Sequence, residues 1–210
     1  MPVCILNIGG IANVTAISEY DKNTFLSRDL GPGNCLIDEW IRNNTKNKFD
    51  NNGEIASQGK SNELILNQTL ENFDNRLNQN VLSYDTKDFS LGFVRGLSLE
   101  DGSATITDFT GTVIAHELLR FLSKEQDKSW KVLVCGGGGK NLTLLKKIQN
   151  QLPKNFSLQN INTFGVDGDY VESQAFAFLA IRSILKLPIS FPSTTGCKKP
   201  SSGGVITENF

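Results

Sequence analysis

The fold of this chain is decided by residues 3–17, which read VCILNIGGIANVTAI. The apolar start of this segment predicts a buried strand, and Val14-Thr15-Ala16-Ile17 predicts a second strand after the Gly9-Gly10 turn. Most Gly-Gly pairs between strands are plain hairpin turns. The alternative is a phosphate-binding turn, because glycine has no Cβ to hold a ligand away from the backbone N–H groups. The amides of Asn7 and Asn13 flank the turn and would contribute to such a site.

Two further glycine-rich turns favour the phosphate-binding interpretation. Gly136-Gly137-Gly138-Gly139-Lys140-Asn141 lies between a predicted strand at 131–135 and a helical pattern that continues to Leu152. Asp29-Leu30-Gly31-Pro32-Gly33-Asn34 leads into another helix, for which Asn34 is the expected N-cap. A strand, then glycines, then a helix N-terminus is a geometry that admits nucleotide phosphates. Neither turn has the spacing of a P-loop or of the dinucleotide-binding fingerprint.

Composition narrows the class of protein. A chain of 210 residues with 39% hydrophobic and 20% charged residues is typical of one globular domain. The net charge of −1 gives no basic patch for nucleic acid. The sequence has no apolar run long enough to cross a membrane and no signal-peptide pattern. The four cysteines lack metal-ligand spacing, which predicts reduced thiols in a cytoplasmic protein.

The order of the predicted elements indicates an α/β fold in a single domain, residues 1–210. Strands are expected near 3–8, 12–17, 25–29, 131–135 and 157–164, and helices after Asn34 and near 66–77, 104–123, 141–152 and 170–186. Three strands of parallel type are therefore expected in the first part of the sequence, and two more in its later part. Residues 43–60 are expected as a loop or short cap, and residues 80–96 as an irregular stretch anchored by Phe89 and Phe93. The tail, 188–206, is expected to wrap the surface.

Five motifs in register resemble those of the anhydro-N-acetylmuramic acid kinases. They are NIGGIAN at 7–13, DLGPGN at 29–34, DGSAT at 101–105, CGGGGKN at 135–141 and GDYVESQAFA at 168–177. The resemblance covers Val3 to about Ile206. It implies an actin/hexokinase/Hsp70-like (ribonuclease H-like) nucleotide-binding fold, mostly its C-terminal lobe. It also implies phosphorylation of 1,6-anhydro-N-acetylmuramic acid, with ring opening, to N-acetylmuramic acid 6-phosphate in cell-wall recycling, using ATP and Mg²⁺.

The resemblance also implies roles for individual residues. The expected nucleotide-binding residues are Asn7, Gly9, Gly10 and Asn13 in a second phosphate loop, and Gly136, Gly137, Gly138 and Asn141 on the adenosine side. Asp29 and Glu172 are the expected substrate-binding residues. Backbone N–H groups and Mg²⁺ suit phosphoryl transfer, which depends on placing and neutralising the phosphates. Opening the anhydro ring requires a carboxylate that activates water.

The resemblance is to the C-terminal portion of longer proteins. In those proteins an N-terminal segment carries the first phosphate loop and the residue expected as the catalytic base. The catalytic residue and the metal ligands of this chain therefore have no assignment from its sequence. The chain is expected to be a truncated kinase. The alternative is an inactive remnant, or a nucleotide- or sugar-binding subunit that needs a separate N-terminal half or a second copy.

Each of these polar residues also has a purely structural explanation. Asp29 would equally well end a strand and accept hydrogen bonds from the following turn. Asp169 and Glu172 suit the first turn of any helix, where the dipole favours carboxylates. The remaining polar residues of interest have simple explanations: Asp101 as a turn residue, His116, Asp38 and Glu39 on solvated helix faces, and Lys140 as an exposed side chain.

Overall fold

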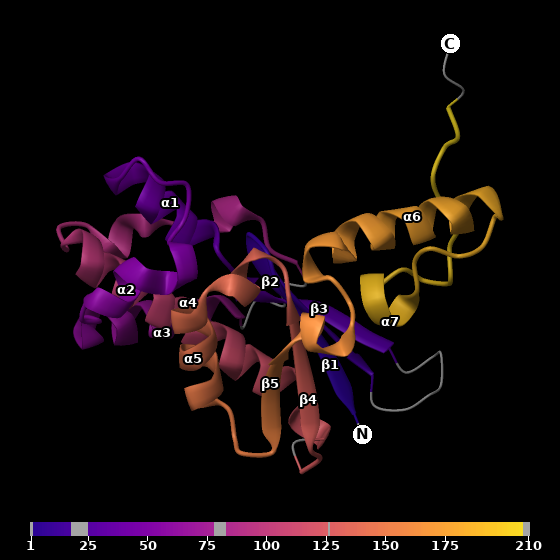
Figure 1. Ribbon diagram of the computed structural model, residues 1–210. Helices are drawn as coiled ribbons and strands as arrows, with labels where there is room; N and C mark the ends of the chain where they lie inside the picture. The colour runs from indigo at the N-terminus through magenta and orange to yellow at the C-terminus, as the bar shows by residue number, and fades with distance from the viewer. Residues whose placement is uncertain (1, 18–24, 78–82, 126, 208–210) are drawn as a thin grey trace.

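The computed structural model describes residues 2–17, 25–77, 83–125 and 127–207. The positions 80–82 of the stretch expected to be irregular lie outside these residues. Figure 1 shows a central sheet with helices α1–α5 on one side and helices α6 and α7 on the other. The α/β class expected from the sequence is confirmed.

The sheet contains five strands, β1 (Val3–Ile8), β2 (Ile11–Ile17), β3 (Phe25–Pro32), β4 (Trp130–Cys135) and β5 (Phe156–Asn160). Their order across the sheet is β3-β2-β1-β4-β5. β2 is antiparallel to β1 and β3, whereas β1, β4 and β5 are parallel. This mixed five-stranded sheet with helices agrees with the α/β nucleotide-binding fold expected from the resemblance.

Two expectations about the strands were wrong. The first three strands are not all of parallel type, since β2 is antiparallel to both β1 and β3. The two-residue turn Gly9-Gly10 can join only antiparallel neighbours. β5 ends at Asn160, and the segment Ile161–Phe164 that follows forms a short 3-10 helix instead of continuing the strand. The other strands start and end within three residues of the predicted positions.

Seven α-helices lie within the described part of the chain. They are α1 (Cys35–Asn44), α2 (Glu54–Gln58), α3 (Glu63–Leu77), α4 (Leu99–Phe121), α5 (Leu142–Gln151), α6 (Val171–Ile184) and α7 (Pro192–Thr195). The short helix α2 lies in the stretch expected as a loop or cap. Phe89 and Phe93 are half-buried against the core, as expected.

Helix α4 is the centre of the helical layer. It contacts β3 and the four helices α1, α2, α3 and α5. It begins earlier than predicted, because Ser98 caps it by accepting a hydrogen bond from Asp101 N at 3.1 Å. Asp101 is therefore a first-turn helix residue and not a turn residue, and its carboxylate accepts from Lys60 N at 2.8 Å. His116 is exposed on this helix, as expected.

Helix α6 lies outside the hydrophobic core. The core is built from the sheet and helices α1, α3, α4 and α5, whereas no residue of α6 is buried. Figure 1 shows α6 apart from α1–α5, with α7 beneath it. The tail returns along itself through a bridge between Ser190 and Ser201, and α7 packs on β3. That the whole chain is one domain stays a prediction.

The described residues carry neither disulfides nor membrane helices. None of the cysteines Cys4, Cys35, Cys135 and Cys197 forms a disulfide, as the sequence predicted. Among the described residues, no helix combines the length and apolar character needed to cross a membrane.

Candidate functional site

The three glycine-rich turns meet at one edge of the sheet. The turn before α1 is bonded to the β1–β2 hairpin turn, since Gly33 N donates to Gly10 O at 2.9 Å and Asn34 N donates to Gly9 O at 2.7 Å. The turn after β4 lies beside the same hairpin, because β1 and β4 are parallel neighbours that end together. Residues almost 130 positions apart are thus brought to one place.

The close approach of these turns requires glycine. A Cβ on Gly33 would lie 2.3 Å from Gly9 O, and one on Gly138 would lie 2.3 Å from Ile8 Cγ2. Gly136 has a positive φ of 79°, and its Cβ would lie 2.4 Å from Asn7 Oδ1. Any side chain at these positions would push the turns apart.

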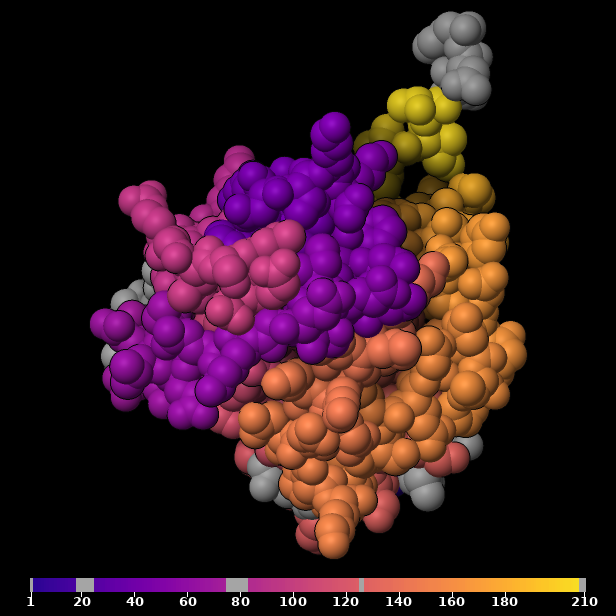
Figure 2. Space-filling model, turned by 60° about the vertical axis from the view of Figure 1, so that its left-hand side comes forward, coloured from indigo at the N-terminus to yellow at the C-terminus, as the bar shows by residue number. Residues whose placement is uncertain are grey.

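A pocket opens on the outer side of the turn after β4, and we call it the glycine pocket. Its lining residues are Asn34, Ile37, Asp38, Phe49, Asp50, Asn51, Asn52, Gly137, Gly139, Lys140, Asn141, Leu142 and Asn160. Figure 2 shows the two walls, where the violet surface of residues near 35–55 meets the orange surface of residues near 137–160. Short polar side chains and open glycine backbone give this pocket many hydrogen-bonding groups.

The expected nucleotide-binding residues divide between this pocket and its support. Gly137 and Asn141 line the glycine pocket, whereas Gly136 and Gly138 pack against Asn7 and Ile8. The side-chain oxygen of Asn141 caps α5 by accepting from Leu144 N at 2.9 Å. Gly136 and Gly138 therefore fix the position of the turn against β1, and Gly137 and Gly139 expose its backbone to the pocket.

The N-cap of helix α1, Asn34, and the helix residue Asp38 have roles that the sequence did not indicate. Asn34 occupies the N-cap position without a side-chain cap, because its Nδ2 points to Ile8 O at 3.4 Å between the glycine turns. Asp38 lines the pocket and is half-buried, so the expected solvated position is right only for Glu39. Burial raises the pKa of Asp38 from its usual 3.8 to about 6, against the opposing charge of Arg42.

A second pocket lies over β3, and we call it the β3 pocket. It is lined by Asn13, Leu26, Ser27, Arg28, Asp29, Ser83, Phe121 and the residues 192–196 of α7 and its C-terminal glycine. The carboxylate of Asp29 accepts hydrogen bonds from Ser83 Oγ at 2.9 Å and Tyr84 N at 3.0 Å. Both donors belong to the segment after α3. The structural explanation of Asp29 expected them in the Gly-Pro-Gly turn instead.

An ion pair with a buried carboxylate lies at the wall of the β3 pocket. The guanidinium of Arg28 binds the carboxylate of Glu117 on α4, and Arg120 lies 3.0 Å from the same carboxylate. Glu117 is only 1% exposed, and burial raises its pKa even though both arginines oppose that shift. Sequence reasoning missed this pair, because nothing in the local pattern connects two positions 89 residues apart.

The β1–β2 hairpin lies between the turn after β4 and the β3 pocket. Asn7 and Asn13 are paired across it. Asn7 faces the turn after β4, where its Oδ1 accepts from Cys135 Sγ at 3.7 Å, and Asn13 lines the β3 pocket. Gly9 and Gly10 form the hairpin turn between them. The hairpin thus supports the turn after β4 through Asn7 and lines the β3 pocket through Asn13, whereas Asn7, Gly9 and Gly10 do not line the glycine pocket.

The start of α6 reaches the glycine turn through one ion pair. Lys140 Nζ lies 2.7 Å from a carboxylate oxygen of Asp169. Glu172 is exposed and lines neither pocket. Its charge nevertheless acts on Cys135, whose pKa is raised first by burial and then by Glu172. Lys140 is exposed, as expected, and carries a carboxylate partner.

The comparison with known proteins decides the family. The sequence profile described as anhydro-N-acetylmuramic acid kinase matches residues 2–209. The chain belongs to the anhydro-N-acetylmuramic acid kinase family. The resemblance seen in the five motifs is thereby confirmed.

The chain matches only part of the length of each curated family member. The protein of that name from Pelagibacter ubique is 53% identical over 209 residues, which are 100% of this chain and 56% of the relative. The proteins of that name from Zymomonas mobilis and Methylorubrum populi are 39% and 36% identical, over 98% and 99% of this chain and 54% and 52% of the relatives. The chain thus spans about half the length of the curated relatives it matches.

Proposed function

We propose that this chain binds ATP in the glycine pocket and forms the nucleotide-binding part of a kinase that phosphorylates 1,6-anhydro-N-acetylmuramic acid. One observation carries the proposal: three glycine turns converge beside a polar pocket, and the same hairpin leads to a second polar pocket. Phosphoryl transfer needs two adjacent sites of this kind, because donor and acceptor must be held in line. Such an ATP-dependent enzyme would work in the cytoplasm.

The phosphates of the nucleotide would lie along the glycine turns. Backbone N–H groups at Gly9, Gly10 and Gly137 have no side chain beside them to keep a phosphate at a distance. Mg²⁺ would be held mainly by the phosphates. The described residues include no cluster of three or more carboxylate, thiol or imidazole groups for a metal ion. This fits Mg²⁺, which is usually bound through one or two carboxylates together with substrate phosphates.

The sugar would occupy the β3 pocket, with Asp29 as the carboxylate that activates water. Its hydrogen bonds to Ser83 and Tyr84 fix the carboxylate at the pocket wall. Water would add at the anomeric carbon and pass a proton to Asp29, and the bond from that carbon to the 6-oxygen would break. The freed 6-oxygen would take the γ-phosphoryl group, and ADP would leave. Glu172 remains a candidate for sugar contact from α6.

A second candidate is a nucleotide- and sugar-binding subunit that acts only with a separate polypeptide. One observation favours it: α6 presents apolar side chains without a buried face. A large exposed apolar patch is typical of a protein–protein contact. The partner would be the remaining half of the family length, or a second copy of the chain.

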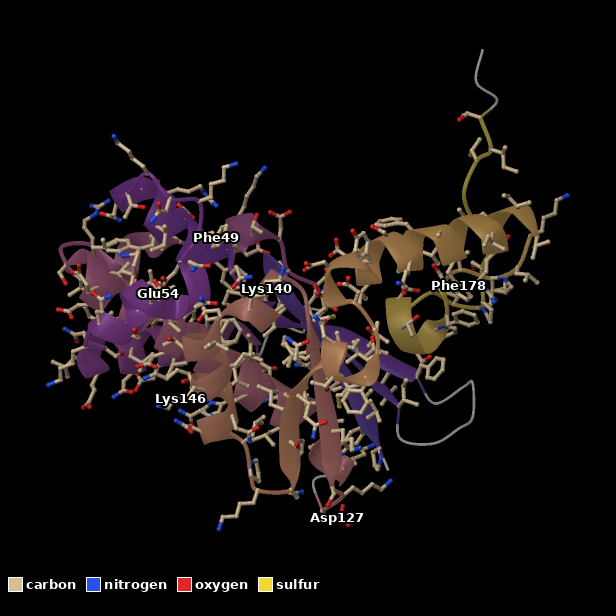
Figure 3. All side chains as sticks on the ribbon, in the orientation of Figure 1. Phe49, Glu54, Asp127, Lys140, Lys146 and Phe178 are labelled. Atoms are coloured by element: carbon tan, nitrogen blue, oxygen red, sulfur yellow. The ribbon has the colours of Figure 1, made fainter. Side chains whose placement is uncertain are left out.

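The test is ADP release from ATP·Mg by the purified chain, with and without 1,6-anhydro-N-acetylmuramic acid. Asp29→Asn should lower a sugar-dependent rate by about 100-fold or more, since a positioned base contributes roughly that factor. Asp127→Asn is the matched control, because Asp127 is an exposed carboxylate at the opposite end of the sheet (Figure 3).

Release that requires the unmatched half of the Pelagibacter relative, added as a separate polypeptide, would support the second candidate. The kinase proposal would be contradicted if a folded sample released no sugar-dependent ADP, either alone or with the added polypeptide.

A further inference from the structure

We infer that Phe49 is the platform on which the base of the bound nucleotide stacks, an inference that rests on the proposed nucleotide site. Phe49 lines the glycine pocket together with Gly137 and Gly139 of the glycine turn. Its side chain is 56% exposed. Figure 3 shows Phe49 and Lys140 near each other at this pocket. One wall of the pocket thus carries an exposed aromatic ring on which a base could stack, and the other wall is the glycine backbone at Gly137 and Gly139.

The backbone at Phe49 is fixed, although the ring is exposed. The next residue, Asp50, is only 4% exposed. Its carboxylate accepts hydrogen bonds from Ile55 N at 2.9 Å and Ala56 N at 3.0 Å, at the start of α2. A carboxylate in this position stabilises a helix N-terminus. Phe49 is therefore held at the rim by a buried anchor one residue away.

The same segment is attached to the helix that follows the glycine turn. Thr143 Oγ1 donates to Gly53 O at 2.8 Å. Gly53 has a φ of +73°, and a Cβ there would lie 2.2 Å from Asn141 Oδ1. Residues 49–53 and the glycine turn thus form two walls with a fixed separation. Walls that need no reordering lose little entropy when a flat ligand enters between them.

The chemistry of the lining suits a base better than a phosphate. Of the described residues that line the pocket, Lys140 is the one cation, and it is paired with Asp169. The remaining polar side chains of the lining are amides and two carboxyls, those of Asn34, Asn51, Asn52, Asn141, Asn160, Asp38 and Asp50. Such groups pair with the edge of a base, while an aromatic ring takes its face.

The experiment measures calorimetric affinities of the full chain for ADP and for inorganic pyrophosphate, which lacks a base. Phe49→Ala should weaken ADP binding roughly 5- to 100-fold, the range of one base–aromatic stack, and should leave pyrophosphate affinity unchanged. Phe49→Tyr should keep ADP affinity. Phe164→Ala is the matched control, because Phe164 is an exposed phenylalanine that lines neither pocket.

A spectroscopic readout separates stacking from a general effect of the substitution. The chain contains two tryptophans, Trp40 and Trp130, and both are buried. In Phe49→Trp, ADP should quench the new emission and pyrophosphate should not.

The outcomes distinguish the inference from the proposed function. If the folded wild-type chain binds neither ADP nor pyrophosphate, the nucleotide site is wrong and the inference falls with it. If the wild-type chain binds ADP, and Phe49→Ala binds it equally tightly, only the base platform is overturned. Loss of ADP affinity together with pyrophosphate affinity would also overturn it, because the ring would then support the turn and not the base.

Discussion

Lys140 and Asp169 connect the glycine turn to the start of helix α6, with Nζ 2.7 Å from a carboxylate oxygen. Both side chains are more than half exposed. An exposed pair of this kind contributes little to stability. Its importance lies in its position, because Lys140 also lines the glycine pocket.

Asp169→Asn should therefore leave the free energy of unfolding within about 1 kcal/mol of wild type. The same change frees the charge of Lys140, so ADP should bind a few-fold more tightly at low salt. That gain should shrink as ionic strength rises, because salt screens exposed charges. Urea unfolding and ADP titrations at two salt concentrations check both parts. Weaker ADP binding by Asp169→Asn would contradict this account of the pair.

Gly138 and Gly139 provide a matched pair of substitutions in one turn. A Cβ on Gly138 would meet Ile8 Cγ2 at 2.3 Å, whereas the nearest atom to a Cβ on Gly139 lies at 3.4 Å. Gly138→Ala should cost about 1–3 kcal/mol of stability, as overpacking does. Gly139→Ala should change stability by less than about 0.5 kcal/mol. Denaturation midpoints test the difference, and equal effects would mean that the turn is not pressed against β1.

Asp38 predicts a pH dependence of stability. Its pKa is raised to about 6 in the folded chain from its usual 3.8. The folded state thus holds the proton more tightly, and stability falls as the pH rises between those values. Asp38→Asn removes this loss. At pH 7 the free energy of unfolding of the variant should exceed that of wild type by on the order of 1 kcal/mol, a figure that allows for the partial exposure of Asp38. At pH 4 the two proteins should be about equally stable. A gain independent of pH would show that the carboxyl is not the cause.

Helix α6 predicts self-association of the isolated chain. Phe176 and Ile181 are exposed on it, and the helix has no buried residue. Replacing both with Glu should reduce association and change the free energy of unfolding by less than about 1 kcal/mol. Sedimentation velocity over a range of concentrations measures the effect. Leu64→Glu, at an exposed leucine on α3, is the control. A wild-type chain that stays monomeric throughout would contradict the prediction.

The sequence predicted local elements well and long-range contacts poorly. The hairpin at Gly9-Gly10 and the helix after Asn34 follow from turn residues and apolar spacing, which act over a few positions. Helix α4 starts before the predicted position near residue 104 because its cap is Ser98, and Asp101, which the sequence pattern assigns to a turn, lies in its first turn. Gly102 is instead needed where a Cβ would lie 2.3 Å from the Trp40 ring.

The site was predictable only where it consists of glycine turns. Those turns carry a sequence signal, and the structure brings them together. Phe49, Asp38 and the Arg28–Glu117 pair carry no such signal, because their surroundings come from elements far apart in the chain. The roles of the individual site residues remain predictions.

The central claim is that the three glycine turns together hold a nucleotide. Hydrogen exchange of the chain with and without ADP·Mg, followed on peptides that cover 7–13, 31–34 and 136–141, tests it directly. We expect protection of all three peptides on ADP binding, and none on a peptide from α3 (Glu63–Leu77). ADP binding that leaves these turns exchanging at the same rate would contradict the account.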